Sequence, residues 1–473
     1  MSGAEPDSLP LTSAVSRTRA RILAAAVRLL AQNPRSTLGD IANAAGVSRS
    51  TLHRHFEGRS ALVDEASRLD DETGAASEEP GSPAAEAAFP PGRLGRERPV
   101  SLEAIHVFDV VAPSLLPEQL VAEAQRIAEV PLGLYVVDID GSHLTRVAGP
   151  ERLPGSLNAP LAIGPELDAD GLAELRAGLA DRPGIEVVPL WLRGRAVGVF
   201  LTLGKPRRPL TEMARQAAAA VALAGGYSDT FARGQRRKQP KAAAEIQQSL
   251  LPARISRVTG GEVAGNVLPC YEVAGDWFDV VENLDGTWIT LADGLGASTP
   301  AAASSAVALG ALRASRRSGG GLRDALLLMH ATLKEMPGPR AEMTAVVIHW
   351  DPASYVLQVA SAGHTRPLVV EAAGDFRELG DRPSRGLGGR SSPRPEVLAA
   401  RLEPGERMIA VSDGVVGEAA GQAGLAAEEI VEAAAGSEGG GAADTVRRIH
   451  RAVLEKSGGD LSDDATVVCL AAV

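Results

Sequence analysis

Six aspartates near the C-terminal end lie where an apolar run gives way to a turn. The runs, such as TWITLADG and RMIAVSDG, are rich in Ile, Val, Leu and Thr, and they predict β-strands that end at the acids. Hard oxygen ligands presented together at strand ends suit Mg²⁺ or Mn²⁺. A single Asp-Gly pair is far more often a turn than a ligand, so the prediction of a divalent-metal site depends on the whole set. That set comprises Asp276 and Asp279 in AGDWFD, Asp293 in ADGLG, Asp413 in SDGV, and Asp463 and Asp464 in SDDAT.

The order and spacing of these segments, with AAEIQQSLLP before them and SAGH among them, resemble the metal-dependent PPM protein phosphatases. The resemblance covers roughly residues 241–473 and points to the bacterial branch typified by stage II sporulation protein E. It implies an α/β/β/α sandwich that holds two divalent cations, Mn²⁺ or Mg²⁺, around a water that attacks phosphoserine or phosphothreonine. A metal pair suits this reaction because phosphate monoesters hydrolyse very slowly unaided. His364 of SAGH is expected to hold a loop rather than to act as an acid.

By motif, the resemblance assigns roles to the acids. The bridging ligand corresponds to Asp293, and the first metal acid corresponds to Asp279 or Asp276. The last acids of the metal site correspond to Asp413 and Asp463, and Asp463 is favoured over its neighbour Asp464 as the ligand. The full set of expected metal ligands is Asp276, Asp279, Asp293, Gly294 through its carbonyl, Asp413, Asp463 and Asp464, of which Asp279, Asp293 and Asp413 are also expected to be catalytic.

A second signal lies at the N-terminal end. From Ser16, the segment RTRARILAAAVRLLAQNP places apolar residues at three-and-four spacing, which predicts an amphipathic helix that ends at Pro34. The stretch STLGDIANAAGVSRSTLHRHFEGRSALVDEA predicts a short helix, a turn at Gly46 and a new helix capped by Ser48. Two helices joined by a turn that contains glycine make a helix-turn-helix.

This arrangement resembles the N-terminal DNA-binding domain of the TetR family, and AGVSRSTLHRHFEGRSAL carries the resemblance. Residues 16–60 hold eight arginines against Asp40 and Glu57, although the whole chain has a net charge of −11. A basic module on an acidic protein suits the phosphates of double-stranded DNA. An arginine-rich helical bundle used for protein contacts is the alternative. By family analogy, the residues facing the major groove are Arg49, Ser50, Thr51 and His53, and those at the phosphates are Arg17 and Arg59. The helix cap Ser48 is also expected among the DNA-binding residues.

A third region lies between two seams in composition. Residues 70–98 are acidic and rich in Pro, Gly and Ala, so they predict a disordered linker. Residues 99–228 predict a helix, antiparallel strands and a final alanine-rich helix, which is typical of an α+β sensory module. Within it, VPLWLRGRAVGVFLTLG resembles the second half of a GAF domain. A pocket for a small-molecule effector and a structural, dimerising role are both open for this region.

The sequence therefore predicts a multidomain chain with an all-α helix-turn-helix head, an α+β GAF-like domain and an α/β/β/α sandwich. Only two cysteines occur, far apart, which argues against a disulfide framework or a zinc site. No apolar run of membrane length and no signal peptide is recognisable, so a cytoplasmic protein without a membrane partner is expected. The expected boundaries are a TetR-like domain at 12–69, the linker at 70–98, the GAF-like domain at 99–228, a linker and signalling helix at 229–250, and the phosphatase domain at 251–473.

The expected function is that of a homodimeric, metal-dependent serine/threonine protein phosphatase with a DNA-binding head. The family resemblance points to an anti-sigma factor antagonist as the phosphoprotein, so that dephosphorylation regulates transcription. The helix from Ala242 to Leu251 is expected to transmit the state of the middle domain to the metal site. The alternatives are a TetR-like regulator whose weakly catalytic tail is a binding platform, and an enzyme whose head merely docks a partner.

Overall fold

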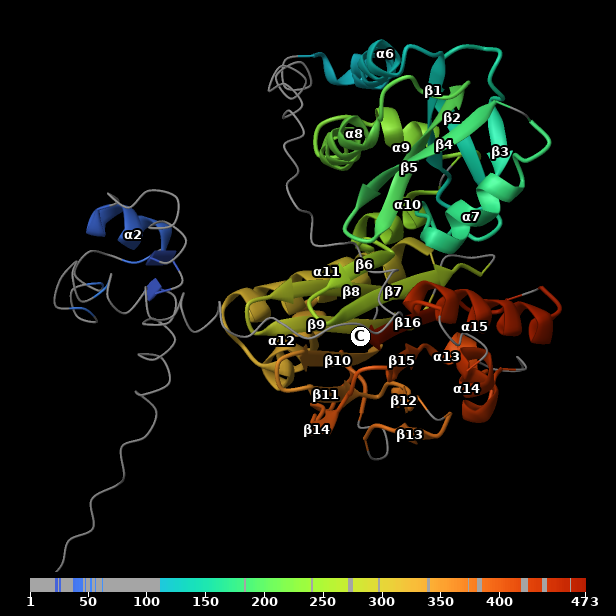
Figure 1. Ribbon diagram of the computed structural model, residues 1–473. Coiled ribbons are helices and arrows are strands. Elements are labelled where there is room, and N and C mark those ends of the chain that lie inside the picture. Colours follow the sequence, from blue (N-terminus) through green and yellow to red (C-terminus); the bar gives the residue numbers. More distant parts are fainter. Residues whose placement is uncertain are drawn as a thin grey trace, which may run out of the picture. The chain divides into compact units, whose positions relative to one another are not determined.

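The computed structural model divides the chain into two compact units, Met1–Glu97 and Arg98–Val473 (Figure 1). The linker expected at 70–98 lies outside the residues that the structure describes. In the first unit, the residues that the structure describes are 22–23, 25–26, 37–45, 47, 52, 56 and 62. In the second unit they are 111–473 except 183, 240, 271–274, 297, 338–340, 373, 381–384, 418–423, 436–439 and 460.

In the first unit, helix α2 (Leu38–Ala44) begins at a capping box. The Oδ2 atom of Asp40 accepts a hydrogen bond from the backbone N–H of Thr37 at 2.8 Å, and Thr37 Oγ1 accepts from the N–H of Asp40 at 3.3 Å. Such reciprocal bonds satisfy two N–H groups that have no partner inside the helix. Ile41 and Ala45 are both buried, which is consistent with the four-residue spacing that places two positions on one face of a helix. The apolar cluster of this unit contains Ile22, Leu23, Ala25, Ala26, Ile41, Ala42, Ala45, Leu52, Phe56 and Leu62.

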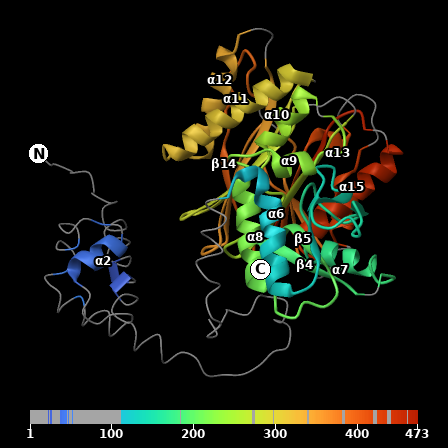
Figure 2. The same cartoon turned by 90° about the horizontal axis from the view of Figure 1, so that it is seen from above.

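The second unit starts with a five-stranded antiparallel sheet in the order β3-β2-β1-β5-β4. Leu134 and Val136 of β1 face a core shared with helices α6 and α8, whereas Tyr135 and Val137 face the side of α7, which follows the two-residue period of a strand. Figure 2 shows α6 and α8 on the same side of this sheet. The elements are η1 (Pro113–Leu115), α6 (Leu116–Ala128), β1 (Leu132–Val137), β2 (His143–Ala148), β3 (Ser156–Asn158), α7 (Ala169–Ala177), β4 (Ile185–Leu192), β5 (Arg195–Leu203), α8 (Thr211–Ala224) and α9 (Thr230–Gly234).

The rest of the second unit contains two further sheets. Sheet one has the order β14-β11-β10-β9-β8, and sheet two has the order β13-β12-β15-β16-β7-β6. Their elements are α10 (Ala242–Leu250), β6 (Ile255–Val258), β7 (Gly261–Leu268), β8 (Trp277–Asn283), β9 (Gly286–Gly294), α11 (Ser298–Arg317), α12 (Leu322–Glu335), β10 (Met343–Asp351), β11 (Val356–Ala362), β12 (Leu368–Val370), β13 (Phe376–Glu378), β14 (Val397–Arg401), β15 (Arg407–Val411), α13 (Asp413–Val416), α14 (Ala427–Ala435), α15 (Ala442–Ser457) and β16 (Ala465–Ala472).

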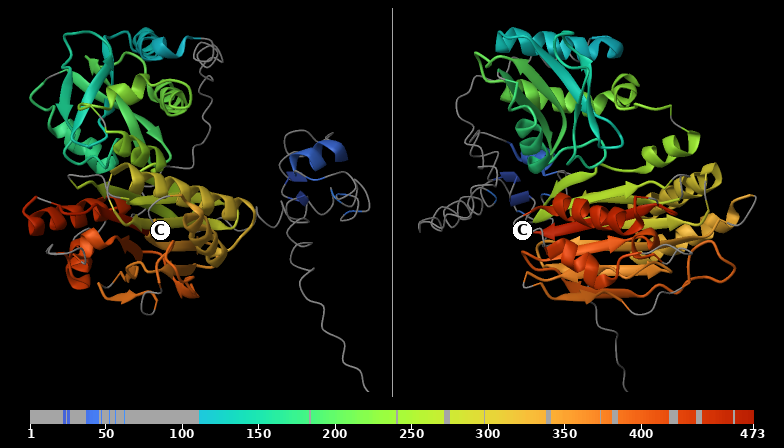
Figure 3. Two further views of the ribbon diagram at one scale, coloured as in Figure 1. Left: turned by 180° about the vertical axis from the view of Figure 1, so that it is seen from behind. Right: turned by 90° about the vertical axis from the view of Figure 1, so that its right-hand side faces the viewer.

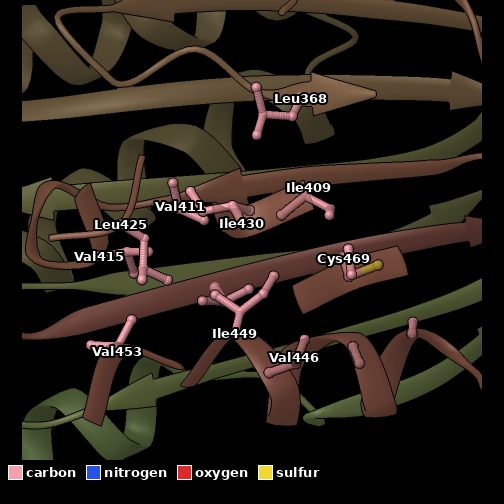
Figure 4. Packing of buried hydrophobic residues seen from close by; sticks show 14 of the residues in the cluster. Leu368, Ile409, Val411, Val415, Leu425, Ile430, Val446, Ile449, Val453 and Cys469 are labelled. Carbon is pink, nitrogen blue, oxygen red and sulfur yellow. The ribbon is translucent and has the colours of Figure 1, made fainter. Parts of the chain in front are cut away.

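These two sheets pack face to face, and helices cover their outer faces (Figure 3). Phe278 and Ile289 of sheet one meet Val468 of sheet two in the central core. Helices α11 and α12 pack on the outer face of sheet one. Helices α14 and α15 pack on sheet two, and Figure 4 shows Val446 and Ile449 pointing from α15 towards the sheet. The layers therefore follow the expected α/β/β/α order.

Buried polar contacts tie the five-stranded domain to the two-sheet sandwich within the second unit. Glu166 accepts a hydrogen bond from the backbone N–H of Ile255 at 2.8 Å and pairs with Arg195 at 3.0 Å. On α15, the guanidinium of Arg447 lies 2.7 Å from the carboxylate of Asp168. Strand β6 and helix α15 are thereby fixed to the segment that precedes α7.

Within the described residues, none of the helices combines the length and the apolar character needed to cross a membrane.

Candidate metal centre

The acids expected to bind metal lie at the ends of two hairpins, one from each sheet. In sheet one, Asp276 directly precedes β8 and Asp293 lies near the end of β9, and Trp277 is in register with Ala292. In sheet two, Asp413 follows β15 at the start of α13, and Asp463 precedes β16. Because β15 and β16 are antiparallel, with Val411 opposite Val467, the end of one lies beside the start of the other.

The electrostatics place these acids in one cluster. Burial, together with Asp293 and Asp464, raises the pKa of Asp276 well above its usual range. Burial and the neighbouring Asp413 raise the pKa of Asp293 to about 8. Burial and the charges of Asp413 and Asp464 raise the pKa of Asp463. Since like charges shift each other's pKa only at short range, acids from both sheets share a single site.

Two carboxylate oxygens at this site are buried without a hydrogen-bond partner, Oδ1 of Asp276 and Oδ1 of Asp413. A buried carboxylate oxygen without a donor costs free energy, and a bound divalent cation would satisfy it. The other oxygen of Asp276 accepts a hydrogen bond from Thr466 Oγ1 at 2.5 Å, which joins sheet one to sheet two. The donor set of carboxylate oxygens therefore fits hard cations such as Mg²⁺ and Mn²⁺.

Among the described residues, no group of three or more His, Cys, Asp or Glu side chains is placed so that it could hold a metal ion. An open arrangement is compatible with Mg²⁺, which usually keeps several waters and takes one or two carboxylates. Two of the acids, Asp276 and Asp293, come from sheet one, and the other two, Asp413 and Asp463, come from sheet two. This arrangement suits ions that retain water, not a closed structural site.

Glycines allow the backbones that carry the acids to approach closely. A Cβ atom on Gly275 would lie 2.5 Å from the carbonyl oxygen of Gly294, and one on Gly414 would lie 2.2 Å from the carbonyl oxygen of Asp464. Both distances are shorter than any side chain tolerates. The Gly-Asp and Asp-Gly pairs of the motifs therefore bring the acids together, beyond forming turns.

The structure corrects the assignment of Asp279 as a metal ligand and catalytic residue. Its carboxylate accepts hydrogen bonds from Arg313 Nη2 at 2.9 Å and from Arg316 Nη1 at 2.8 Å, and both arginines belong to α11. Asp279 lies three residues after Asp276, and positions at odd spacing on an extended chain point to opposite faces. Asp279 therefore fixes α11 to the outer face of sheet one, and Asp276 is the first acid of the cluster.

The adjacent acids Asp463 and Asp464 have different environments. Asp464 is fully buried, and its two oxygens accept hydrogen bonds from Cys270 N at 2.9 Å and from Gln247 Nε2 at 2.7 Å. Asp463 is half-buried and accepts from the backbone N–H of Asp464 at 2.8 Å. Donors of the chain therefore engage both oxygens of Asp464, which favours Asp463 as the ligand and gives Asp464 a supporting role.

Sequence reasoning missed Gln247 on α10. Its side-chain N–H₂ donates to Asp464 and also to the backbone carbonyl of Asp276 at 3.1 Å. The one signal in the sequence is its position, because Gln247 occurs on the buried face of α10 with Ala243 and Leu250. A polar residue on the apolar face of a helix needs a buried partner.

His364 is fully buried, and burial lowers its pKa to about 4. Its Nδ1 atom is hydrogen-bonded to Thr365 Oγ1 at 2.9 Å, and the Thr365 hydroxyl also donates to the carbonyl of Val411. The neutral imidazole thus lies in a network that holds the loop after β11 to the end of β15. This position supports the structural role expected for it.

Two cavities adjoin the cluster and share Gly363. The first has a volume of about 480 Å³, and the second has a volume of about 320 Å³. The first is lined by Leu295, Glu342, Met343, Thr344, Gly363, Arg385, Gly386, Leu387, Gly389, Arg390 and Ser391. The second is lined mainly by apolar residues, including Leu368, Val411, Val416, Leu425 and Ile430.

The family model for stage II sporulation protein E (SpoIIE) matches residues 284–472, which include Asp293, Asp413 and Asp463. The model for bacterial regulatory proteins of the tetR family matches residues 22–66. Residues 284–472 therefore form a SpoIIE-type domain, and residues 22–66 belong to a TetR-type head. The residues proposed to contact DNA, Arg17, Ser48, Arg49, Ser50, Thr51, His53 and Arg59, lie outside the residues that the structure describes.

The TetR-type head is similar to that of the HTH-type transcriptional repressor LfrR of Mycolicibacterium smegmatis, with 52% identity over 52 residues. This match covers 11% of the chain and 28% of the repressor, so the chain spans little more than a quarter of this curated relative. The similarity therefore concerns the head alone.

Among solved structures, the chain is similar to the SiaA-PP2C domain of Pseudomonas aeruginosa, with 19% identity, 44% of this chain and 84% of that chain covered, and a TM-score of 0.39. It is also similar to a structure of the RsbU and RsbW domains of Rv1364c from Mycobacterium tuberculosis. There the identity is 25%, the match covers 47% of this chain and 61% of that chain, and the TM-score is 0.38.

Proposed function

We propose that the chain is a metal-dependent serine/threonine protein phosphatase whose TetR-type head binds double-stranded DNA. The observation that carries the proposal is the shared cluster of acids from two sheets, with buried, unpartnered oxygens on Asp276 and Asp413. A purely structural sandwich gains nothing from such a cluster, because buried like charges destabilise the folded state.

The residues proposed to hold two divalent cations, Mn²⁺ or Mg²⁺, are Asp276, Asp293, the carbonyl of Gly294, Asp413 and Asp463. When bound, such a cation pair supplies an activated water and neutralises charge on the phosphoryl group. The chain itself supplies orientation. Thr466 fixes one oxygen of Asp276, and Gln247 fixes the supporting carboxylate of Asp464.

The proposed substrate is a phosphoserine or phosphothreonine on a protein, and an anti-sigma factor antagonist is the class that the SpoIIE resemblance favours. Removing its phosphate would change the activity of a sigma factor, which suits an enzyme that also carries a DNA-binding head. A protein substrate needs a groove beside the acids, and the two cavities that meet at Gly363 offer one.

We assign a sensory role to the GAF-like region at 99–228, with a small-molecule effector and a homodimer as its proposed partners. Its helix-sheet-helix order and its buried contacts to β6 and α15 support a regulatory domain. The boundaries at 12–69, 229–250 and 251–473 are part of the same proposal.

The test of the phosphatase proposal is hydrolysis of p-nitrophenyl phosphate and of a phosphoserine peptide by the full-length chain, with and without Mn²⁺. Asp293→Asn and Asp413→Asn should each reduce turnover to background, because each removes a charge from the cluster. Asp351→Asn is the matched control, since Asp351 caps an exposed turn through Ala353 and Ser354. Turnover that is independent of metal, or that survives both substitutions in the cluster, would refute the proposal.

The second candidate is a TetR-like regulator whose phosphatase-like tail is a binding platform, and the match of residues 22–66 to the tetR family favours it. A mobility shift on the upstream DNA of the chain's own gene tests the head. Binding should weaken as salt rises and should be lost in Arg49→Ala. DNA binding together with metal-independent, background hydrolysis would favour this candidate over the enzyme.

A further inference from the structure

The first cavity beside the metal centre is formed by a segment that is fixed to the start of β10. The backbone N–H of Leu387 donates to the carbonyl of Met343 at 2.7 Å, and the N–H of Met343 donates to the carbonyl of Leu387 at 3.2 Å. One residue later, the N–H of Gly388 donates to Nδ1 of His330 on α12 at 3.1 Å. Residues 385–391 are therefore attached to sheet one at Leu387 and to α12 at Gly388.

Two glycines let this segment lie directly on the backbone that precedes β10. Gly388 has a φ of +73°, and a Cβ atom there would lie 1.8 Å from the carbonyl oxygen of Ala341. A Cβ atom on Gly386 would lie 2.9 Å from the carbonyl oxygen of Met343. No other residue type fits at Gly388, so the backbone that carries the neighbouring side chains is closely defined.

The cavity begins at the metal centre itself. Thr344 of its lining is in register with Asp293, and Met343 is in register with Gly294. After Gly294, the N–H of Leu295 donates to the carbonyl of Glu342 at 2.9 Å, so the cavity wall continues from the end of β9, which carries Asp293, and from the start of β10 beside it. A residue of a bound protein that flanks the reacting phosphate can therefore reach this cavity.

The charge of the cavity is the reverse of that of the metal centre. Arg385 and Arg390 line it and are exposed, and in the described part of the chain neither makes an ion pair or a hydrogen bond. Glu342 is the acid among the lining residues, and it has an interaction of its own. Two guanidinium groups held on a fixed backbone suit carboxylates, because arginine binds planar anions through two parallel hydrogen bonds.

We propose that this cavity receives acidic side chains of the phosphoprotein that flank the phosphorylated residue, with Arg385 and Arg390 as specificity-determining residues. The inference rests on the proposed phosphatase function and adds the class of sequence that the enzyme prefers. The net charge of the chain is −11, so an acidic substrate would otherwise be repelled, and a local basic pocket overcomes that repulsion where the phosphate must enter.

The experiment compares three phosphoserine peptides with the full-length chain and Mn²⁺. Their flanking residues are Asp and Glu in the first peptide, Asn and Gln in the second, and Lys in the third. The wild type should show its highest kcat/KM on the acidic peptide, chiefly through a lower KM. In Arg385→Gln and Arg390→Gln, the ratio of kcat/KM for the acidic peptide to that for the neutral peptide should fall by about fivefold each.

Reversing the charge of both arginines separates a role in substrate specificity from a structural role. A double substitution, Arg385→Glu with Arg390→Glu, should make the lysine-flanked peptide the preferred substrate, which a merely structural role of these arginines would not cause. Arg323→Gln is the matched control, because Arg323 is exposed on the first turn of α12 and lies outside the cavity lining. It should leave the ratio unchanged.

Different results would overturn the proposed role of the cavity and the proposed phosphatase function. Equal kcat/KM on all three peptides, or an unchanged ratio in every arginine variant, would overturn the assignment of the cavity while leaving the phosphatase intact. A peptide with a second phosphoserine in place of the acidic residues, if it alone were preferred, would overturn the choice of carboxylates. Absence of Mn²⁺-dependent turnover on every peptide and on p-nitrophenyl phosphate would overturn the proposed function and this inference together.

Discussion

Two aspartates three positions apart in AGDWFD have opposite surroundings. Asp276 is packed against the carboxylates of Asp293 and Asp464, whereas Asp279 is neutralised by Arg313 and Arg316. The carboxylates around Asp276 repel one another, and a bound cation would reduce that repulsion. The carboxylate of Asp279 is already paired with two guanidinium groups. The same residue type thus lies in a repulsive acidic cluster at one position and has a packing role at the other.

This contrast predicts different responses to metal. In the wild type, Mn²⁺ at about a hundred times its Kd should raise the melting temperature of the phosphatase domain by roughly 5–10 °C. Asp276→Asn should abolish that shift, because it removes a ligand. Asp279→Asn should retain the shift but lower the stability by roughly 3–5 kcal/mol, because Arg316 is left buried without its full counter-charge.

Differential scanning fluorimetry with and without Mn²⁺, supported by calorimetric titration of the metal, measures both responses. Loss of the metal-induced shift in Asp279→Asn would return Asp279 to the list of ligands. A full shift in Asp276→Asn would remove Asp276 from it.

A buried histidine predicts the acid sensitivity of the same domain. Burial lowers the pKa of His450 to about 4, from 6.5 for the free side chain. Between these values the unfolded state binds the proton and the folded state does not, so stability is lost as the pH falls from about 6.5 to about 4. His450→Leu should reduce this loss by up to about 3 kcal/mol.

Urea unfolding of the wild type and of His450→Leu at several pH values between 4 and 7 tests this expectation. The two pH profiles should diverge only below about pH 6.5. Parallel profiles across the whole range would show that His450 does not titrate differently on unfolding.

At the scale of elements, helix α10 has a direct contact with the metal centre. It follows the five-stranded domain in the chain, and Gln247 connects it to Asp464 and to the backbone of Asp276. A rotation or shift of α10 would withdraw both hydrogen bonds at once. We therefore propose α10 as the element that couples the five-stranded domain to the acids.

Gln247→Met tests this coupling with little change in volume. The Asp464 carboxylate would lose one of its donors, and kcat/KM should fall by about 10- to 100-fold, as is usual when a partner of a metal-site residue is lost. Ser249→Ala on the same helix is the control, because within the described part of the chain the Ser249 hydroxyl donates to the carbonyl of Ile246 on its own helix. Wild-type kinetics in Gln247→Met would show that α10 does not support the site.

The sequence predicts the elements well where burial imposes a regular period. The strands that end at Asp293 and Asp413, and the helix from Ala242, occur where the apolar runs place them. The choice between Asp276 and Asp279 needed the partner of Asp279, which lies on a helix more than 30 residues later. Gln247 and Asp464 are 217 residues apart, and local patterns carry no information about such a pairing.

The cavity beside the acids was beyond sequence reasoning for a similar reason. Arg385 and Arg390 belong to a glycine-rich stretch that predicts only a loop. Their proximity to Asp293 follows from the bridge between Leu387 and Met343, which depends on the close approach that Gly388 permits. Loops held in place by a rigid scaffold in this way often carry binding residues.

At the scale of the whole molecule, the second unit presents exposed apolar side chains on its five-stranded domain. Leu223 of α8 is 69% exposed, and Tyr227, just after the helix, is 56% exposed. Apolar side chains that remain in water near one helix end are candidates for contact with a second copy of the chain. They are consistent with the proposed homodimer.

If α8 carries the dimer contact, Leu223→Glu should shift the full-length chain from dimer to monomer. Light scattering coupled to size-exclusion chromatography measures the mass directly. Leu284→Glu is the matched control, because Leu284 is fully exposed in the turn between β8 and β9 and should leave the mass unchanged. A monomeric wild type, or a dimer that persists in Leu223→Glu, would exclude this surface as the contact.

The position of β16 in sheet two has a consequence for synthesis of the protein on the ribosome. Strand β16 hydrogen-bonds to β15 on one side and to β7 on the other, and among the strands that the structure describes it is made after both. Until it emerges, the halves of its sheet have no shared hydrogen bonds, and their open edges are prone to aggregation. A nascent chain halted before residue 463 would lack Asp463, so on the proposed function translation must pass this point before the metal centre can be completed.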